Sequence, residues 1–315
     1  MQLQTNKQTE APEWRCQLLF MIITPNWPEK VQFLMDFSFP LVDELLPRKE
    51  FIGGRIGYPK QVLFVWLLIK KITNWDYRTM ASMASVSHPT LIRANRKFNE
   101  AGVYQKVLLR LVKDAYKKGL IKGEKVALDS SFVKTYSRKE ELGSGGWNGH
   151  KESYGFKLHA LIDANSGALI ALIIGDGVTH DSQVAIPLLK KARPWLKKCG
   201  YVLADKGYDS SDIVEYIVKS LHAKATIPIK KINKGKNYNP RGAYQNWKEK
   251  AKGRCIKKSI YNKRTEVERL FSTLKRTFKL GRERIRGIKA FIGQTYLACI
   301  CFMLRKLWGF GVVQI

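Results

Sequence analysis

The spacing of apolar residues changes near residue 123, and this change divides the chain into two kinds of structure. Before it, the apolar runs are long and helix-like. Residues 59–69 (PKQVLFVWLLI) follow a glycine-rich stretch and begin with a proline, which the first turn of a helix tolerates. After residue 123, short β-type runs alternate with amphipathic segments. The pattern therefore predicts a helical region followed by a region of mixed strands and helices.

The helical region has the order of elements found in a helix-turn-helix unit. A helix from residue 59, a short helix over residues 75–85 and a turn precede a basic helix that Ser87 or Pro89 opens. We expect residues 89–98 to enter a DNA groove. The alternative is a small helical bundle whose exposed face happens to be basic. The candidate DNA contacts on this helix are Arg93, Arg96 and Lys97.

Residues 125–135 and 154–177 predict three strands in a row, because the second stretch holds two β-type runs around an Asn-Ser-Gly turn. Helices and strands then alternate, and Asp181 or Ser182 opens the first of these helices as its N-cap. This order predicts a mixed sheet with an antiparallel edge and helices packed on it. We expect an α/β protein of the α+β type with a ribonuclease H-like core. The alternating segments are a helix over 181–192, a strand over 201–205, a helix over 211–222 and a strand over 223–229.

The chain therefore divides into three parts. Residues 1–30 mix polar residues, three prolines and scattered aromatics without a clean period, and we interpret them as a loosely ordered lead. Residues 31–122 form the helical, helix-turn-helix-like region, which we expect to bind DNA. Residues 123–315 form the ribonuclease H-like domain.

A basic loop interrupts the second part of that domain. Residues 230–260 contain eleven Lys or Arg and a single acidic residue, together with Tyr238, Tyr244 and Trp247. Basic residues interleaved with aromatics suit a loop that follows a nucleic-acid strand, because bases stack where the backbone charge is neutralised. The alternative is a solvated loop that is disordered in the free protein.

The charge of the chain indicates the kind of partner that it binds. The chain has 56 Lys plus Arg against 26 Asp plus Glu, a net charge of +30 spread along its length, which favours a nucleic-acid partner. Its five cysteines show neither a disulfide framework nor a CxxC metal spacing, which indicates a reducing cytoplasm. The apolar runs 18–23 and 296–304 are too short for a signal sequence or a membrane span, so we expect no membrane partner.

The stretch 261–275 (YNKRTEVERLFSTLK) predicts an amphipathic helix with two glutamates on different faces. At about 100° per residue, Glu268 falls on a polar face beside the apolar stripe, whereas Glu266 falls on the far side of that stripe. We expect Glu266 to meet solvent or a neighbouring basic residue. For Glu268 the alternative to a role in chemistry is a plain ion pair with Arg264, one turn away. The polar face consists of Tyr261, Arg264, Glu268 and Lys275.

Two aspartates join Glu268 as candidate ligands. Asp129 lies within a predicted strand and Asp205 ends another, and a carboxylate in a buried strand costs several kcal/mol unless it is paired or binds a cation. Carboxylates without accompanying His or Cys are ligands for Mg2+ or Mn2+. Two such ions per active site, held by Asp129, Asp205 and Glu268, suit an in-line displacement at a phosphodiester.

The four residues Tyr261, Arg264, Glu268 and Lys275 match the Y-(2)-R-(3)-E-(6)-K signature of insertion-sequence transposases, in the branch of families four and five. Further stretches over residues 123–310 resemble the same group, among them LDSSFVK, GVTHDSQVAIPLL and LADKGYD. The resemblance implies that Asp129, Asp205 and Glu268 are the DDE catalytic triad. It also implies that water nicks the element's ends and that the freed 3′ hydroxyl attacks target DNA.

Other polar residues are candidates for DNA contact or for structure. Lys275 lies about 10 Å along the helix from Glu268, which suits a flanking phosphate. Tyr261 is a candidate for a phosphate or a base, or for partial burial, and Lys157 for a phosphate. We interpret His159 and His180 as structural.

We therefore expect a transposase that cleaves insertion-sequence ends and transfers them into target DNA. Synapsis of two ends predicts a homodimer in the DNA complex, and DNA as substrate predicts a cytoplasmic, nucleoid-associated protein. Two alternatives stay open. One is a Mg-dependent nuclease without strand transfer, and the other is a non-catalytic, sequence-specific repressor derived from a transposase.

Overall fold

The computed structural model describes residues 27–46, 58–135, 145–229, 251–282 and 286–308. Contacts divide the chain into two compact units, Met1–Val103 with Val313–Ile315 and Tyr104–Val312. Most of the predicted lead (1–30) and most of the predicted basic loop (230–260), with its three aromatic residues, lie outside the described residues.

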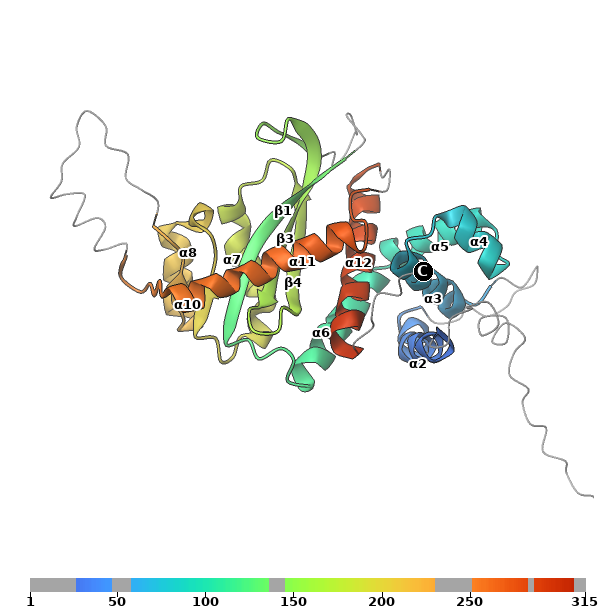
Figure 1. Cartoon of the computed structure of the whole chain (residues 1–315), viewed down its shortest axis with the longest axis horizontal. Coiled ribbons are helices and arrows are strands. Elements are labelled where there is room, and N and C mark those ends of the chain that lie inside the picture. Colours follow the sequence, from blue (N-terminus) through green and yellow to red (C-terminus); the bar gives the residue numbers. More distant parts are fainter. Residues whose placement is uncertain (1–26, 47–57, 136–144, 230–250, 283–285, 309–315) are drawn as a thin grey trace, which may run out of the picture. The chain divides into compact units, whose positions relative to one another are not determined.

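The first unit is helical, as the sequence predicts. Its described helices are α2 (Trp27–Leu45), α3 (Lys60–Thr73), α4 (Tyr77–Ala84) and α5 (His88–Glu100) (Figure 1). Pro59 precedes α3, Asp76 caps α4 by accepting a hydrogen bond from the Thr79 N–H at 2.7 Å, and Ser87 precedes α5. The helix α2 was not predicted as a separate element; it begins in the predicted lead (1–30), continues into the helical region (31–122) and contains Pro40.

Helix α5 buries one face and exposes the other. Leu91, Ala94 and Phe98 are buried, and the Phe98 ring meets Phe64 of α3 edge-on with centroids 5.6 Å apart. The intervening positions of the helix face solvent, so a basic surface is available to a partner. The exposed basic residues are Arg93, Arg96 and Lys97.

The second unit contains a mixed sheet with the predicted succession of strands. The order of its main path is β2-β3-β1-β5-β6, and β4 pairs with β3. β3 is antiparallel to β1, β2 and β4, whereas β5 is parallel to β1 and β6. This is a ribonuclease H-like sheet, and only the short β2 was not predicted. The strands are β1 (Lys125–Lys134), β2 (Gly146–Asn148), β3 (Ser153–Asp163), β4 (Leu169–Asp176), β5 (Tyr201–Leu203) and β6 (Lys224–Thr226).

Helices pack on the two faces of this sheet, and Figure 1 shows α11 (Thr265–Arg276) lying across β1 and β3. Val267, Leu270 and Leu274 form the buried stripe of α11. The next helix, α12, stacks Phe291 on Phe156 of β3 with ring centroids 4.7 Å apart. The other helices of this unit are α6 (Val103–Lys117), α7 (Asp181–Ala192), α8 (Ser211–Glu215), α10 (Lys258–Tyr261) and α12 (Ile288–Trp308).

The apolar helix α12 is long enough to cross a membrane by length and composition alone. Within the described residues, however, 67% of the stretch Ile288–Leu307 is buried inside the protein. Its residues Ala298, Ile300 and Met303 are fully buried. Core helices of globular domains have this character, because an element that is apolar all round is covered by protein.

A buried polar cluster lies on the α7 face of the sheet. His159 of β3 is 1% exposed, and neither ring nitrogen has a hydrogen-bond partner among the described residues. Its Nδ1 lies 3.7 Å from Oδ1 of Asp181, which also accepts a hydrogen bond from Lys157 Nζ at 3.2 Å. The predicted N-cap role of Asp181 is therefore wrong. His180 occupies the N-cap position, and Asp181 lies in the first turn, where it faces the two basic residues of β3.

We predict that His159 stays neutral well below pH 6.5. Burial lowers its pKa to about 4, and the Asp181 charge opposes this only partly. Because the unfolded chain takes up the proton first, this residue makes the protein lose stability as pH falls from about 6.5 towards 4. Imidazole NMR titration of the five histidines checks this, and His159→Gln identifies the signal. A midpoint near 6.5 for that signal would contradict the burial described here.

Candidate active site

Strand register places Asp129 and Asp205 beside each other. β1 and β5 run parallel with Ala127 opposite Leu203, and each aspartate lies two residues further along its chain. Residues two apart on a strand point to the same face, and neighbouring strands lie about 4.8 Å apart. Asp205 follows β5 with an extended backbone (φ −76°, ψ 176°), so it continues the direction of the strand.

Asp129 is a partly buried carboxylate, and both of its oxygens accept hydrogen bonds. Oδ1 accepts from the Ser130 N–H at 2.8 Å, and Oδ2 accepts from Nη1 of Arg264 at 3.1 Å. Burial raises the pKa of Asp129 to about 6; the charges of Asp205 and Asp181 act in the same direction, while the Ser130 N–H and Arg264 oppose it. The ionised carboxylate therefore has less positive charge around it than it needs.

Arg264 joins Asp129 to Glu268. Its Nη2 donates to Oε1 of Glu268 at 2.6 Å, one helical turn further along the chain. The side chains of Arg264 and Asp129 are 18% and 19% exposed, whereas that of Glu268 is 51% exposed. The ion pair that the sequence left as an alternative is thus present, and Asp129 is an additional partner. One guanidinium lies as a cation between a strand carboxylate and a helix carboxylate.

The backbone around Arg264 differs from the predicted single helix over 261–275. Helix α10 ends at Tyr261, a 3₁₀ turn covers Asn262–Arg264, and α11 begins at Thr265. Short 3₁₀ turns are frequent at the ends of α-helices. Arg264 ends the turn next to β1, with its Cζ 5.8 Å from the centroid of the Tyr261 ring.

The two predicted phosphate-binding lysines are both engaged within the protein. Lys275 Nζ donates to the carbonyl oxygen of Phe132 on β1 at 2.8 Å, and burial lowers the pKa of Lys275. Lys157 Nζ donates to the Thr179 carbonyl at 2.9 Å and to Asp181, on the α7 face. Arg264 thus links Asp129 to Glu268 and lies near Tyr261, and Asp205 lies beside Asp129. Lys157 belongs instead to the cluster around His159.

The donor chemistry at Asp129 and Asp205 fits a divalent cation. Asp205 Oδ1 accepts from the Gly207 N–H at 2.7 Å, while Oδ2 has no hydrogen bond among the described residues. The charge of Asp205 raises the pKa of Asp129, and a cation beside both carboxylates would offset this repulsion. Glu268 is not grouped with them, since Arg264 holds it. Across the described ranges, no three His, Cys, Asp or Glu side chains are grouped closely enough to hold an ion.

Comparisons with known proteins place this site in a family. The family model of the transposase DDE domain matches residues 121–304, more than half of the 315-residue chain. The putative transposase for insertion sequence element IS6501 of Brucella ovis is 30% identical over 149 residues, which cover 47% of this chain and 98% of that protein.

Solved structures give weaker likenesses. The cryo-EM structure of the piggyBac transposase synaptic complex with hairpin DNA is 10% identical, with 93% of this chain and 81% of that chain covered and a TM-score of 0.36. The Mos1 transposase paired-end complex with left transposon end is 11% identical, with coverages of 82% and 88% and a TM-score of 0.23. The assignment therefore depends on the sequence matches. The chain belongs to the family of transposases with a DDE domain.

Proposed function

We propose that this protein cleaves DNA at the ends of an insertion sequence and joins those ends to target DNA, with Asp129, Asp205 and Glu268 as the catalytic carboxylates. The observation that carries the proposal is the contact between Arg264 and two of these residues, at 3.1 Å to Asp129 and 2.6 Å to Glu268. This contact joins residues distant in sequence at a central strand of the sheet, and Asp205 follows the neighbouring strand β5. Membership of the DDE transposase family supports this assignment.

Divalent metal ions are general cofactors of this family, and we propose two Mg2+ or Mn2+ ions per active site. When bound, such ions supply the positive charge that stabilises an in-line displacement at phosphorus. Asp129 and Asp205 are the residues that hold this charge on the sheet. Asp129 requires positive charge nearby, because burial and the neighbouring aspartates raise the pKa of its carboxyl group.

Glu268 completes the set by changing partner. Its side chain is half exposed and is held by one hydrogen bond from Arg264, so a rotation of either side chain frees its carboxylate. A DNA phosphate is a suitable alternative partner for the Arg264 guanidinium, because planar Arg binds phosphate oxygens in a bidentate manner. Arrival of DNA thus moves the arginine from the carboxylates to the substrate and leaves Glu268 free to join the aspartates.

The remaining proposed contacts follow the charge of the chain. The net charge of +30 favours DNA as the partner, and the exposed basic face of α5 suits a groove. We propose that Tyr261, whose ring lies near Arg264, contacts the same strand, and that Lys275 reaches a flanking phosphate on leaving the Phe132 carbonyl. A homodimer in the DNA complex follows from the need to bring two ends together, and association with the nucleoid follows from DNA as the substrate.

We predict that Asp129→Asn, Asp205→Asn and Glu268→Gln each lower metal-dependent cleavage by at least about a hundredfold, because each removes charge that the displacement needs. DNA affinity should change by less than about threefold, since little volume and no contact with groove or base is lost. The measurement maps cuts on both strands of the element's own flanking DNA with Mg2+. Glu215→Gln is the matched control, because Glu215 is exposed on α8 and pairs with Lys219.

Joining of a pre-nicked end separates this proposal from a nuclease. A protein that cleaves duplex but gives no strand-transfer product is a nuclease, and a protein that binds specifically but never cleaves is a repressor. Full activity in any of the three variants would remove that carboxylate from the proposed site.

We also predict that Mn2+ stabilises the wild-type protein through Asp129. The rise of its pKa from 3.8 to about 6 means that the ionised carboxylate costs about 3 kcal/mol at neutral pH. The sign follows: folding favours the protonated form, so this cost is absent below about pH 4 and complete above about pH 6. At a hundredfold excess over Kd, bound ion should raise Tm by roughly 5 to 10 °C.

Thermal unfolding at pH 7.5 measures this effect. Asp129→Asn should have a metal-free Tm at or above that of the wild type and should lose the response to Mn2+, whereas the exposed Asp212→Asn should keep it. An equal response in Asp129→Asn and the wild type would place the ion elsewhere.

A further inference from the structure

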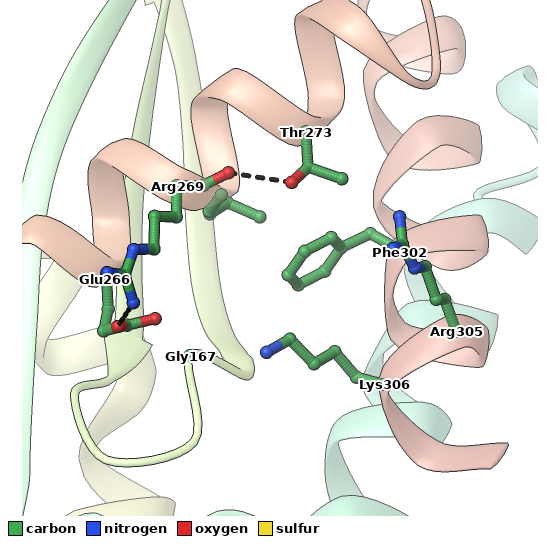
Figure 2. Close-up of a pocket in the computed structure, with 8 residues that line it drawn as sticks. Gly167, Glu266, Arg269, Thr273, Phe302, Arg305 and Lys306 are labelled. Carbon is green, nitrogen blue, oxygen red and sulfur yellow. Dashed lines mark hydrogen bonds and ion pairs between the residues drawn. The ribbon is translucent and has the colours of Figure 1, made fainter. Parts of the chain in front are cut away.

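A polar cavity lies between α11 and α12, on the side of α11 away from Glu268. Figure 2 shows its lining: Arg269 and Thr273 come from α11, Phe302, Arg305 and Lys306 from α12, and Gly167 from the turn between β3 and β4. Its volume is about 430 Å³, which lies within the range of small-ligand sites. We call it the α11–α12 cavity. Glu266 and Glu268 lie about 200° apart around α11, so the helix separates the cavity from the catalytic carboxylates.

The cavity carries more positive than negative charge. Its lining includes three cations and one carboxylate, Glu266, and Glu266 is already paired with Arg269. Arg305 is exposed and has no hydrogen bond or ion pair among the described residues, and Lys306 Nζ donates to the Ser166 carbonyl at 2.8 Å. Within the part of the chain that the structure describes, two of the positive charges therefore have no carboxylate partner. In Figure 2 the Lys306 side chain extends across the cavity towards Gly167.

Gly167 keeps this cavity open. Its φ of +68° is a conformation that residues with a side chain rarely adopt. A Cβ atom here would come within 3.1 Å of Glu266 Oε2 and 3.2 Å of Lys306 Nζ, so it would crowd both charged groups. Phe302 is 4% exposed and gives the cavity an apolar wall. The result is a recess with an apolar wall and a lining rich in cations.

We propose that the α11–α12 cavity binds a phosphate group of a DNA backbone, on a stretch of DNA that passes along the opposite side of α11 from the scissile phosphate. Arg269, Arg305 and Lys306 supply the hydrogen-bond donors that phosphate oxygens accept. The catalytic carboxylates lie on the opposite side of α11. The phosphate bound in the cavity therefore differs from the scissile phosphate at those carboxylates. This inference rests on the proposed function in one respect, namely that DNA is the partner.

The test measures affinity for a 30-bp duplex over a range of salt concentrations, without metal, in an Asp129→Asn background. Loss of one phosphate contact lowers the slope of log K against log salt by about 0.9. We expect Arg305→Gln combined with Lys306→Gln to lower the slope by about 0.9, as for one phosphate contact, and to weaken binding about tenfold. Lys197→Gln combined with Lys198→Gln removes the same charge from two exposed residues elsewhere and should leave the slope nearly unchanged.

Two single variants test the chemistry of the cavity. Glu266→Gln removes its carboxylate and should tighten duplex binding several-fold. Arg305→Lys keeps the positive charge and should retain most of the affinity that Arg305→Gln loses. Equal slopes in the cavity double variant and the Lys197/Lys198 control overturn the proposal.

Two further results would also overturn the proposal. Arg305 and Lys306 lie in the last turn of α12, where basic residues also favour the helix dipole. A lower Tm with unchanged duplex affinity means that they serve only the helix end. If inorganic phosphate raises the Tm of the wild type but not of the double variant, while duplex affinity is equal in both, the cavity binds a small phosphate instead of DNA.

This test is independent of catalysis. If the wild type fails to cleave its flanking DNA while the double variant still lowers the slope, the proposed function fails and the cavity remains a DNA contact. If cleavage and joining occur with equal slopes, the cavity proposal fails alone.

Discussion

A single guanidinium holds the candidate site together. Arg264 bonds Asp129 on β1 and Glu268 on α11, and 135 residues of chain separate Arg264 from Asp129. A partly buried carboxylate is costly in ionised form unless a cation lies beside it. The structure meets this need with an arginine at the end of a 3₁₀ turn, and catalysis would meet it with metal ions. In the proposed mechanism, metal ions therefore replace the arginine as the cation beside Asp129.

The buried stripe of α11 gives the helix two separate polar surfaces. Val267, Leu270 and Leu274 fix the rotation of the helix against the sheet, so residues on either side of the stripe cannot exchange faces. Glu268 consequently lies on the side of Asp129, and Glu266 lies on the side of α12. Two like residues at neighbouring positions therefore have different partners, Arg264 for one and Arg269 for the other. In the proposal, this separation lets one helix contact two stretches of DNA.

Most of the fold follows from periodicity in the sequence. Alternation of apolar and polar residues, broken by turns, predicts β1, β3 and β4 in a row, and the later helices and strands follow their own periods. The short β2 was missed because three residues carry no period. The sequence also predicted that Glu266 meets solvent or a neighbouring basic residue, and its ion pair with Arg269 confirms this. The angle between positions around a helix is enough for that prediction.

The details of the site were less predictable, because they depend on contacts between distant segments. The hydrogen bond from Arg264 to Asp129 requires the register of β1 and the 3₁₀ turn at Asn262–Arg264. Neither of these can be predicted from the local sequence. The sequence predicted Asp181 as an N-cap, whereas it pairs with Lys157 on β3. This contact also joins distant segments, so the local sequence does not predict it. In the sequence, residues 296–304 were identified only as a short apolar run, and α12 was not predicted. The cavity that Arg305 and Lys306 line was therefore missed, because it depends on the packing of α11 against α12.

The most direct test of the central claim is an anomalous-difference map from crystals grown with Mn2+ and a DNA end. The account predicts Mn2+ bound by the carboxylates of Asp129 and Asp205, with Arg264 turned from Glu268 to a DNA phosphate. Ions bound away from both aspartates, with Arg264 still joining Asp129 to Glu268 in the presence of DNA, would contradict it.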